Sequence, residues 1–476
     1  MNNQNDHTHF TRRNFVKMMG TGCAVAGLSS PLGLLSGCST PKSSEFSYLH
    51  DVIKTKNVSP VFAWTDILLQ AMRNTTTTPP PATRAFAMAH TAGFLAVNGI
   101  TGGYRTPFAL EDGPKNADPN VAYGVAASMA LSEALSNSFV FDRVNYLRQF
   151  PDGEAKERGI AYGKRAAEVV INTRINDGAE PNKANFYLGR YPRRGDSLQW
   201  SPTGPFYGAE EGPFLGTFHR GLLPGWGAVK PWVMKNKGDF LARPFPNIYS
   251  AEFAEQYEHV REMGRYDSDT RTEDQTQIAF FWEDGPRGVT PPGHWQIVAM
   301  RVIQDMDLPL LEQARLHALL SMAQADAAIT TWDSKYTHDI IRPETTIRQR
   351  ANSIGNPYIK GTEDRNWRSL IFTPDFPAYT SGHSAFSGVS ARMIANFIGR
   401  DAVAFSAPPA DIVNWPKQLG TGKIRRSWTS LWQAAEENGM SRIYGGVHWD
   451  ADNNEGLRVG RDLADHVFQH AFEKVV

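Results

Sequence analysis

Three short segments in the last third of the chain contain side chains that could hold an oxyanion. In the first, Lys335 and Arg342 are seven residues apart, which is two helical turns, so both are expected on one side of a helix. Taken alone, this spacing is more typical of a solvated cationic stripe. The apolar neighbours Trp332 and Ile340 favour a buried helix, and Pro343 fixes where that helix must end or kink.

The second segment is Ser381-Gly382-His383, at a predicted helix start. A helix N-terminus offers free N–H groups and the positive end of the helix dipole, which together suit an anion. Glycine lets the backbone approach an anion closely, and the serine hydroxyl adds a donor. An ordinary serine N-cap would look the same, so this triplet is weak evidence by itself.

The third segment runs from Ser441 to Asp452. Arg442 offers a planar fork of donors for an oxyanion. His448 is four residues before Asp452, and on a helix this spacing lets the carboxylate hold one ring nitrogen while the other serves as ligand or nucleophile. In isolation, a partly exposed histidine–aspartate pair is the commoner explanation. The three segments together supply the donors for a tetrahedral oxyanion, with one histidine to bind the central atom and one to act as acid or base.

The order and spacing of these residues resemble the three-part signature of the vanadium-dependent haloperoxidases and of the related type 2 phosphatidic acid phosphatase-like acid phosphatases. The similarity extends over roughly residues 83–470. The family usually has proline before Ser-Gly-His, where this chain has Thr380, and that change removes no ligand. The matching pattern is Lys335-(six residues)-Arg342-Pro343, Ser381-Gly382-His383 and Ser441-Arg442-(five residues)-His448-(three residues)-Asp452.

The resemblance implies a role for each matching residue. His448 would bind vanadium through one ring nitrogen, or become phosphorylated in a phosphatase, and Asp452 would orient it. His383 would be the acid/base next to the apical oxygen of a bound vanadate. Asp284 is a candidate partner of Arg442. The equatorial oxygens would be held by Lys335, Arg342, Ser381, the main chain of Gly382, and Arg442.

Two activities share such a site, because histidine-bound vanadate has the trigonal bipyramidal geometry of a phosphoryl group in transfer. Trp332 and Phe376 favour the peroxidase, since they look like the positions of an apolar halide niche in the fungal chloroperoxidases; ordinary helix packing is their alternative explanation. Length also favours it, because simple acid phosphatases of the superfamily lack an N-terminal half like residues 48–250.

We therefore expect a vanadate-dependent haloperoxidase that oxidises halide with hydrogen peroxide to hypohalous acid. An acid phosphatase or phosphotransferase with a phosphohistidine intermediate is the alternative. A surface-anchored helical binding protein with an inactive pocket is a third hypothesis. The sequence indicates neither the halide nor the organic acceptor.

Small and apolar residues recur at three- and four-residue spacing, which predicts closely packed helices, whereas residues from about 180 to 250 are rich in Pro, Gly and Trp. We predict an all-α protein of two helical bundles of the four-helix type, joined by long irregular loops, with the active site in the C-terminal bundle. The predicted helices are 84–100, 120–139, 158–175, 249–264, 271–284, 293–304, 311–332, 384–399, 429–438 (capped by Thr429 and stopped by Gly439) and 454–473.

The N-terminus resembles an export signal. Arg12-Arg13 precede an uncharged run over 18–37, as in a twin-arginine signal, and the run ends in a lipobox-like sequence whose Cys38 would become the lipidated N-terminus. A single transmembrane helix is the alternative, although Pro31 breaks the run. We expect a protein held by lipid in the bacterial periplasm, at the outer membrane or on the cell surface. The predicted segments are a signal (1–37), a tether (38–48), an N-terminal helical half (49–250) and a C-terminal bundle (251–476).

Charge and cysteine content exclude some classes of protein. The chain has 49 basic and 49 acidic residues, so it lacks the basic field that a nucleic-acid partner normally needs. Its two cysteines, Cys23 and Cys38, both lie in the signal segment, so the mature chain has no disulfide. No apolar run of about 20 residues follows the signal, and membrane contact is therefore expected through the lipid only.

Overall fold

A computed structural model describes residues 58–179, 196–201, 221–361, 363–412, 415–416, 419 and 424–475. In these ranges the chain forms fourteen α-helices, two 3₁₀ helices and four strands of two or three residues. The all-α prediction is therefore confirmed. The described residues belong to one compact unit. The predicted signal, tether and Cys38 lie outside the described residues.

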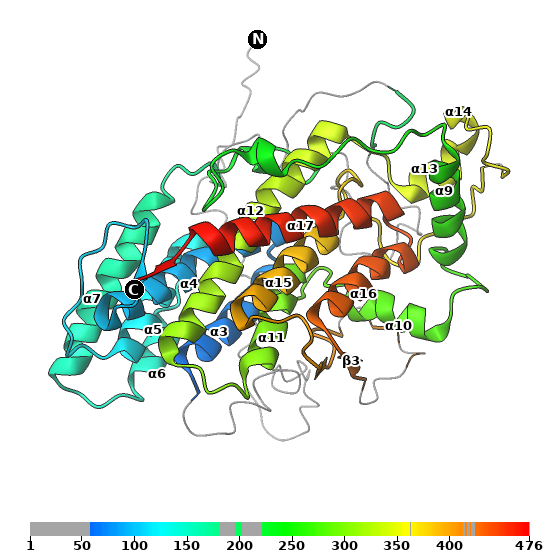
Figure 1. The fold of residues 1–476 in the computed structure, drawn as a ribbon. Helices are drawn as coiled ribbons and strands as arrows, with labels where there is room; N and C mark the ends of the chain where they lie inside the picture. The colour runs from blue at the N-terminus through cyan, green and yellow to red at the C-terminus, as the bar shows by residue number, and fades with distance from the viewer. Residues whose placement is uncertain are drawn as a thin grey trace, which may run out of the picture. The chain divides into compact units, whose positions relative to one another are not determined.

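Five helices form the first helical group (Figure 1). Proline occupies the first turn of three of them, α3, α4 and α5, where its missing N–H costs nothing. Asp118 caps α5 by accepting hydrogen bonds from the backbone of Asn120 and Val121. The five helices are α3 (Pro60–Thr75), α4 (Pro79–Thr101), α5 (Pro119–Leu135), α6 (Val140–Leu147) and α7 (Glu154–Thr173).

The second group contains the predicted site segments. Its most extensive helix contact joins α15 and α17, which lie side by side in Figure 1. Gly388 makes this contact close, since a Cβ there would lie 2.5 Å from the Leu457 carbonyl oxygen. The helices are α9 (Ala251–Met263), α10 (Glu273–Phe281), α11 (Thr290–Ile303), α12 (Leu310–His338), α13 (Pro343–Gln349), α14 (Ala351–Ile354), α15 (Gly382–Ile398), α16 (Leu431–Tyr444) and α17 (Asp450–His470).

Short elements complete the fold. Strand β1 (Tyr104–Arg105), which follows α4, pairs antiparallel with β4 (Glu473–Lys474) at the C-terminal end of the described chain. Strand β2 (Phe405–Ala407) pairs with β3 (Arg426–Trp428). The 3₁₀ helices are η2 (Trp226–Ala228) and η3 (Lys237–Phe240), both within the stretch predicted to be irregular.

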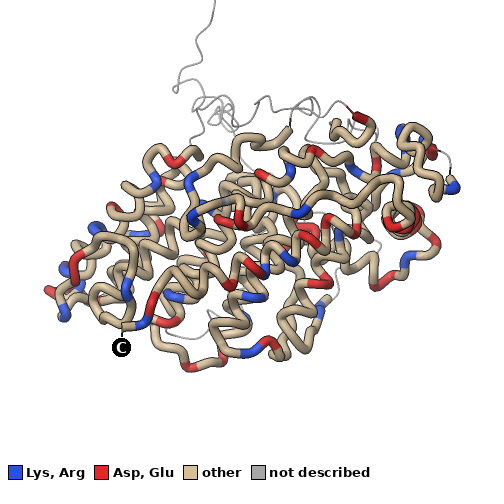
Figure 2. The backbone as a smooth tube through the Cα atoms, turned by 45° about the horizontal axis from the view of Figure 1, so that its top comes forward, with Lys and Arg blue, Asp and Glu red and all other residues tan. Residues whose placement is uncertain are grey.

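Helix α12 connects the two groups, because it packs on α4 of the first and on α15 of the second. A continuous cluster of buried apolar side chains extends from α3 to the end of α17. The division into two bundles near residue 250 stays a prediction. Figure 2 shows Lys and Arg interspersed with Asp and Glu along the described chain. None of the described helices is both long and apolar enough to cross a membrane.

Two predicted helix signals near residue 430 are wrong. The N-cap of α16 is Ser430, not Thr429, and the helix continues through Gly439 to Tyr444. Gly439 is a packing residue: a Cβ there would overlap the side-chain oxygen of Asn453 on α17. The sequence patterns also missed α3, α6, α13 and α14, and they ended α12 six residues early.

Candidate active site

The three predicted site segments meet where helices of the second group begin and end. Lys335 lies in the last turn of α12 and Arg342 is the N-cap of α13. Ser381 is the N-cap of α15, and Arg442 lies in the last turn of α16. His448 lies two residues before α17, whose first turn contains Asp452. The ends of five helices therefore place these side chains together.

Lys335 and Arg342 converge on one loop. The ammonium of Lys335 donates to the carbonyls of Pro377 and Ala378, each at 3.0 Å, and to that of Thr380. Arg342 Nε donates to the Phe376 carbonyl at 2.8 Å. The two cations are not on one helix as predicted, because α12 ends at His338 and the next residue is left-handed. They meet at residues 376–380 instead, directly before Ser-Gly-His.

His448 forms the predicted pair with Asp452. Its Nδ1 lies 2.7 Å from Asp452 Oδ2, which also accepts the backbone N–H of Trp449 at 3.0 Å. Nε2 of His448 lies 3.0 Å from Nη1 of Arg342. Burial, followed by the charges of Arg342 and Lys335, lowers the pKa of His448 well below its usual value. The ring is therefore neutral, with its proton on Nδ1 and a lone pair on Nε2.

The Ser-Gly-His segment forms the start of α15. Ser381 Oγ accepts the backbone N–H of Ser384 at 3.2 Å, so the hydroxyl hydrogen is left to donate elsewhere. The Ser381 backbone N–H donates to the Asp452 carbonyl at 3.0 Å, which joins this segment to α17. Gly382, as the first helical residue, contributes a backbone N–H that needs no partner within the helix.

Nε2 of His383 is bound to the main chain, which leaves Nδ1 as the ring nitrogen available to the site. Nε2 donates to the carbonyl of Glu283 at 3.1 Å. Burial first, then the charge of Arg442, lowers the pKa of His383 well below its usual value. His383 is therefore a neutral ring that can accept a proton at Nδ1.

Arg442 is held by the segment that precedes Asp284. Its Nη2 donates to the carbonyls of Ala279 at 3.1 Å and Trp282 at 2.9 Å, and burial lowers its pKa to about 10. The charges of Glu283 and, after it, Asp284 oppose that shift in the pKa of Arg442. The hydrogen bonds of the Asp284 carboxylate go to His294, at 2.9 and 3.2 Å. Asp284 thus acts on Arg442 through its charge. A direct hydrogen bond between the two side chains stays a prediction.

The two predicted halide-niche aromatics are in contact. The ring centroids of Trp332 and Phe376 are 5.2 Å apart at an angle of 47°. Lys335 Nζ lies 4.9 Å from the Phe376 centroid, and the guanidinium carbon of Arg342 lies 5.0 Å from it. An apolar wall therefore lies directly beside two buried cations.

The site contains more buried positive than negative charge. Lys335, Arg342 and Arg442 are at most 3% exposed, and the carboxylates that act on Arg342 are Asp452 and then Asp375. Burial lowers the pKa of Lys335 well below its usual value and that of Arg342 to about 9. Among the described residues, Nη2 of Arg342 is buried with no hydrogen-bond partner. Buried cations are costly unless an anion compensates them, so this donor set fits a tetrahedral oxyanion such as vanadate or phosphate.

Sequence reasoning missed the groups that hold the site residues in place. The carbonyls of residues 376–380, Trp282 and Glu283 belong to the main chain, and no residue type signals them. His294 was not singled out either, because its aspartate lies ten residues earlier and outside any helical spacing.

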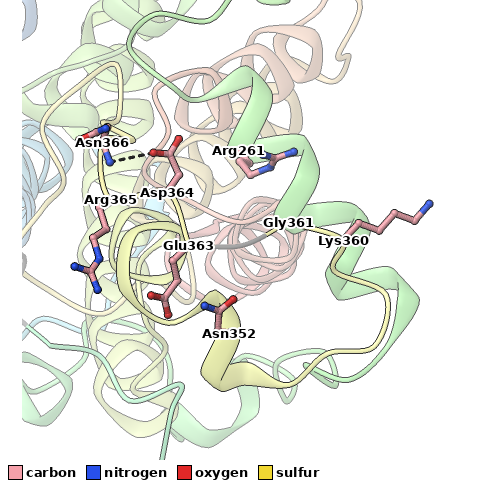
Figure 3. Close-up of a pocket in the computed structure, with 8 residues that line it drawn as sticks. All are labelled: Arg261, Asn352, Lys360, Gly361, Glu363, Asp364, Arg365 and Asn366. Atoms are coloured by element: carbon pink, nitrogen blue, oxygen red, sulfur yellow. Dashed lines mark hydrogen bonds between the residues drawn. The ribbon is translucent and has the colours of Figure 1, made fainter.

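One hollow in the described chain lies away from these residues. Figure 3 shows an open, polar pocket formed by α9 and the loop after α14, with Lys360 extending outward and Asp364 bonded to the backbone of Asn366. Both acidic and basic side chains line it. None of its lining residues belongs to the predicted oxyanion site.

Comparison with known proteins points to one group. The family description "VCPO second helical-bundle domain" matches residues 315–475, which include all the site segments except Asp284. A vanadium chloroperoxidase from Curvularia inaequalis is 27% identical over 285 residues, which are 49% of this chain and 46% of that protein. The match thus spans about half the length of this curated relative.

Solved structures match over most of the chain. The crystal structure described as the first bacterial vanadium-dependent iodoperoxidase is 26% identical, with a TM-score of 0.71, and the match covers 88% of this chain and 98% of that one. An apo-type bacterial vanadium-dependent chloroperoxidase is 16% identical, with a TM-score of 0.67, over 83% of this chain and 94% of that one. At that identity the second match shows the shared fold alone.

Proposed function

We propose that the chain is a member of the vanadium-dependent haloperoxidase family, to which its matches point, and that it oxidises halide with hydrogen peroxide to hypohalous acid at a bound vanadate. The observation that supports this most directly is the buried excess of positive charge next to a neutral His448, whose Nε2 lone pair faces Nη1 of Arg342. Vanadate, when bound, would act as a Lewis acid that makes peroxide electrophilic toward halide without a redox change at the metal.

His448 would be the residue that binds vanadium, through Nε2. The hydrogen bond from Nδ1 to Asp452 fixes the tautomer and the ring orientation, and it makes Nε2 a better ligand. Arg342, whose Nη1 faces Nε2 and whose Nη2 is buried without a partner in the described part of the chain, would donate to the oxyanion. Lys335, Arg442, the Ser381 hydroxyl and the Gly382 N–H would hold its remaining oxygens.

His383 would move the proton. A neutral imidazole whose Nε2–H is bound to the Glu283 carbonyl can accept a proton at Nδ1, and peroxide must lose protons as it is activated. The resulting imidazolium would lie near Arg442, and this repulsion favours prompt release of the proton. His383 therefore suits a proton carrier better than a permanent charge.

Trp332 and Phe376 would form the halide niche. Their rings would exclude water from one side of the site. Lys335 Nζ and the guanidinium carbon of Arg342, 4.9 and 5.0 Å from the Phe376 centroid, would attract an anion. Truncation of Phe376 to alanine should therefore raise KM for halide more than it changes vanadate affinity. Equal changes in both quantities would assign Phe376 to packing alone.

The proposal is tested by halogenation of a phenolic dye with hydrogen peroxide, measured with chloride, bromide and iodide before and after addition of orthovanadate. We expect activity that appears only with vanadate and halide together. If vanadate-loaded protein halogenates no dye with any halide, and instead cleaves a phosphate ester in its vanadate-free state, the haloperoxidase proposal is wrong.

A phosphatase remains a second candidate because the same observation supports it. A neutral His448 with its Nε2 lone pair directed at Arg342 is also arranged as a nucleophile toward a phosphoryl group. A phosphohistidine trapped at His448 by acid quench with a labelled phosphate ester would favour this candidate.

We also propose that the protein is exported and lipid-anchored through Cys38. The lipobox-like sequence over residues 35–38 supports this. Metabolic labelling with a fatty acid should label the wild-type protein and not Cys38→Ala. Labelling of both would remove Cys38 as the anchor.

A further inference from the structure

Two site residues are held by successive carbonyls of the segment 282–289, which joins α10 to α11 and is called the turn below. The Trp282 carbonyl accepts Nη2 of Arg442 at 2.9 Å, and the next carbonyl, of Glu283, accepts Nε2 of His383 at 3.1 Å. A small rotation of this turn would move both acceptors together. The position of the turn therefore sets the orientation of a cation and of the proton carrier in the same site.

This turn adopts a conformation that non-glycine residues disfavour. Asp284 has φ of 46° and Arg287 of 67°, and Thr290, where α11 begins, has φ of 68°. Left-handed backbone is strained in non-glycine residues and persists only where the surroundings hold it. Contacts outside the turn must therefore fix it. At the C-terminal end of the turn, Asp411 Oδ2 accepts the Val289 N–H at 2.7 Å.

His294 holds the start of the turn through Asp284. Its Nδ1 lies 2.9 and 3.2 Å from the two carboxylate oxygens of Asp284, and both side chains are at most 1% exposed. The ring packs on Trp282, with centroids 4.5 Å apart at 30°, and on Phe281, with centroids 5.4 Å apart. His294 therefore contacts the residues on both sides of the Glu283 carbonyl.

His294 also anchors the turn to a rigid element. It lies early in α11, which packs on α15, the helix that begins with Gly382 and His383. Among the described residues, Nε2 of His294 is buried with no hydrogen-bond partner, so Asp284 is its hydrogen-bonding contact. The hydrogen bond to Asp284 therefore offsets the cost of burying this polar imidazole.

We propose that His294 is a positioning residue for the active site: by holding Asp284, it fixes the turn whose Glu283 carbonyl binds Nε2 of His383 and thereby presents Nδ1 to the oxyanion. This deepens the proposed function, on which the catalytic meaning of His383 rests. The geometric claim itself concerns the vanadate-free protein and is tested there.

The test is the hydrogen-exchange rate of the His383 ring proton, followed by NMR on the full chain with ¹⁵N-labelled histidine and no vanadate. The His383 signal is assigned by its loss in His383→Gln. The Nδ1 proton of His448, bound to Asp452 in the same pocket, is the internal reference. In His294→Leu we expect the His383 proton to exchange roughly tenfold faster, as for the loss of one ordinary hydrogen bond, while the His448 proton is unchanged.

Two further variants separate positioning from folding. His294→Asn keeps a donor near the place of Nδ1 and should restore slow exchange at His383. Asp284→Gly removes the carboxylate but suits φ of 46°, so it should fold and still show the fast exchange, even if His294→Leu does not fold. Slow exchange at His383 in folded Asp284→Gly, or equally accelerated His383 and His448 protons, overturns the proposal. A failure to oxidise halide would overturn the proposed function and leave this measurement standing.

Discussion

Replacing Asp452 by asparagine tests how the proposed vanadium ligand is prepared. Asp452 Oδ2 accepts Nδ1–H of His448 at 2.7 Å and the Trp449 N–H at 3.0 Å, whereas Oδ1 is buried without a partner among the described residues. An asparagine of the same shape can place its oxygen at the Oδ2 position and its NH₂ at the Oδ1 position. The change removes the charge and keeps the geometry.

The expected loss follows from that geometry. A charge-assisted hydrogen bond becomes a neutral one of about half the strength, and loss of such support for a ligand typically lowers metal affinity about 10–100-fold. This corresponds to about 1.4–2.7 kcal/mol. Burial raises the pKa of Asp452 to about 7, against the opposing effect of the Trp449 N–H and Lys335. Below pH 7 the wild-type side chain is itself largely neutral, so the difference should be largest above pH 7 and shrink below it.

Vanadate affinity is measured by titration with intrinsic tryptophan fluorescence at pH 8 and pH 5.5. Asp450→Asn is the matched control, since Asp450 is in the same helical turn but binds His259 instead of His448. The reasoning is refuted if Asp452→Asn binds vanadate within twofold of wild type at pH 8, or if Asp450→Asn loses as much affinity.

Three further predictions concern the site and its supports. His448→Ala should lose vanadate retention in equilibrium dialysis, whereas His383→Ala should retain vanadate and lose roughly 10²–10⁴ in turnover; equal loss of vanadate in both would contradict the division of roles. Gly439→Ala should lower the free energy of unfolding by about 1–3 kcal/mol in urea, because the methyl group overlaps the side chain of α17, and an unchanged midpoint would contradict that packing. Burial raises the pKa of Asp375 from 3.8 to about 6, so the folded state binds this proton more tightly than the unfolded state does. The stability that comes from the bound proton is therefore lost as the pH rises from about 4 to 6. Asp375→Asn should remove that decline, worth at most about 3 kcal/mol, in urea unfolding at several pH values, and an unchanged pH slope would rule it out.

The sequence by itself determined the helical class and the residues that meet at the site. Lys335, Ser381 and His448 could be found because the order and spacing of their three segments resemble a family signature, whereas the apolar periodicity of α4, α12 and α15 is a local property of the chain. The His448–Asp452 pair was predictable too, because four residues separate it and the start of α17 preserves that reach.

Tertiary structure alone decided how these residues are held. Lys335 and Arg342 meet at residues 376–380 although α12 ends between them, and Gly439 packs against α17 instead of ending α16. The hydrogen bonds from Arg442 and His383 reach main-chain carbonyls 160 and 100 residues away along the chain. Main-chain acceptors are identical at every residue, so no sequence pattern marks which of them the fold will bring to a buried side chain.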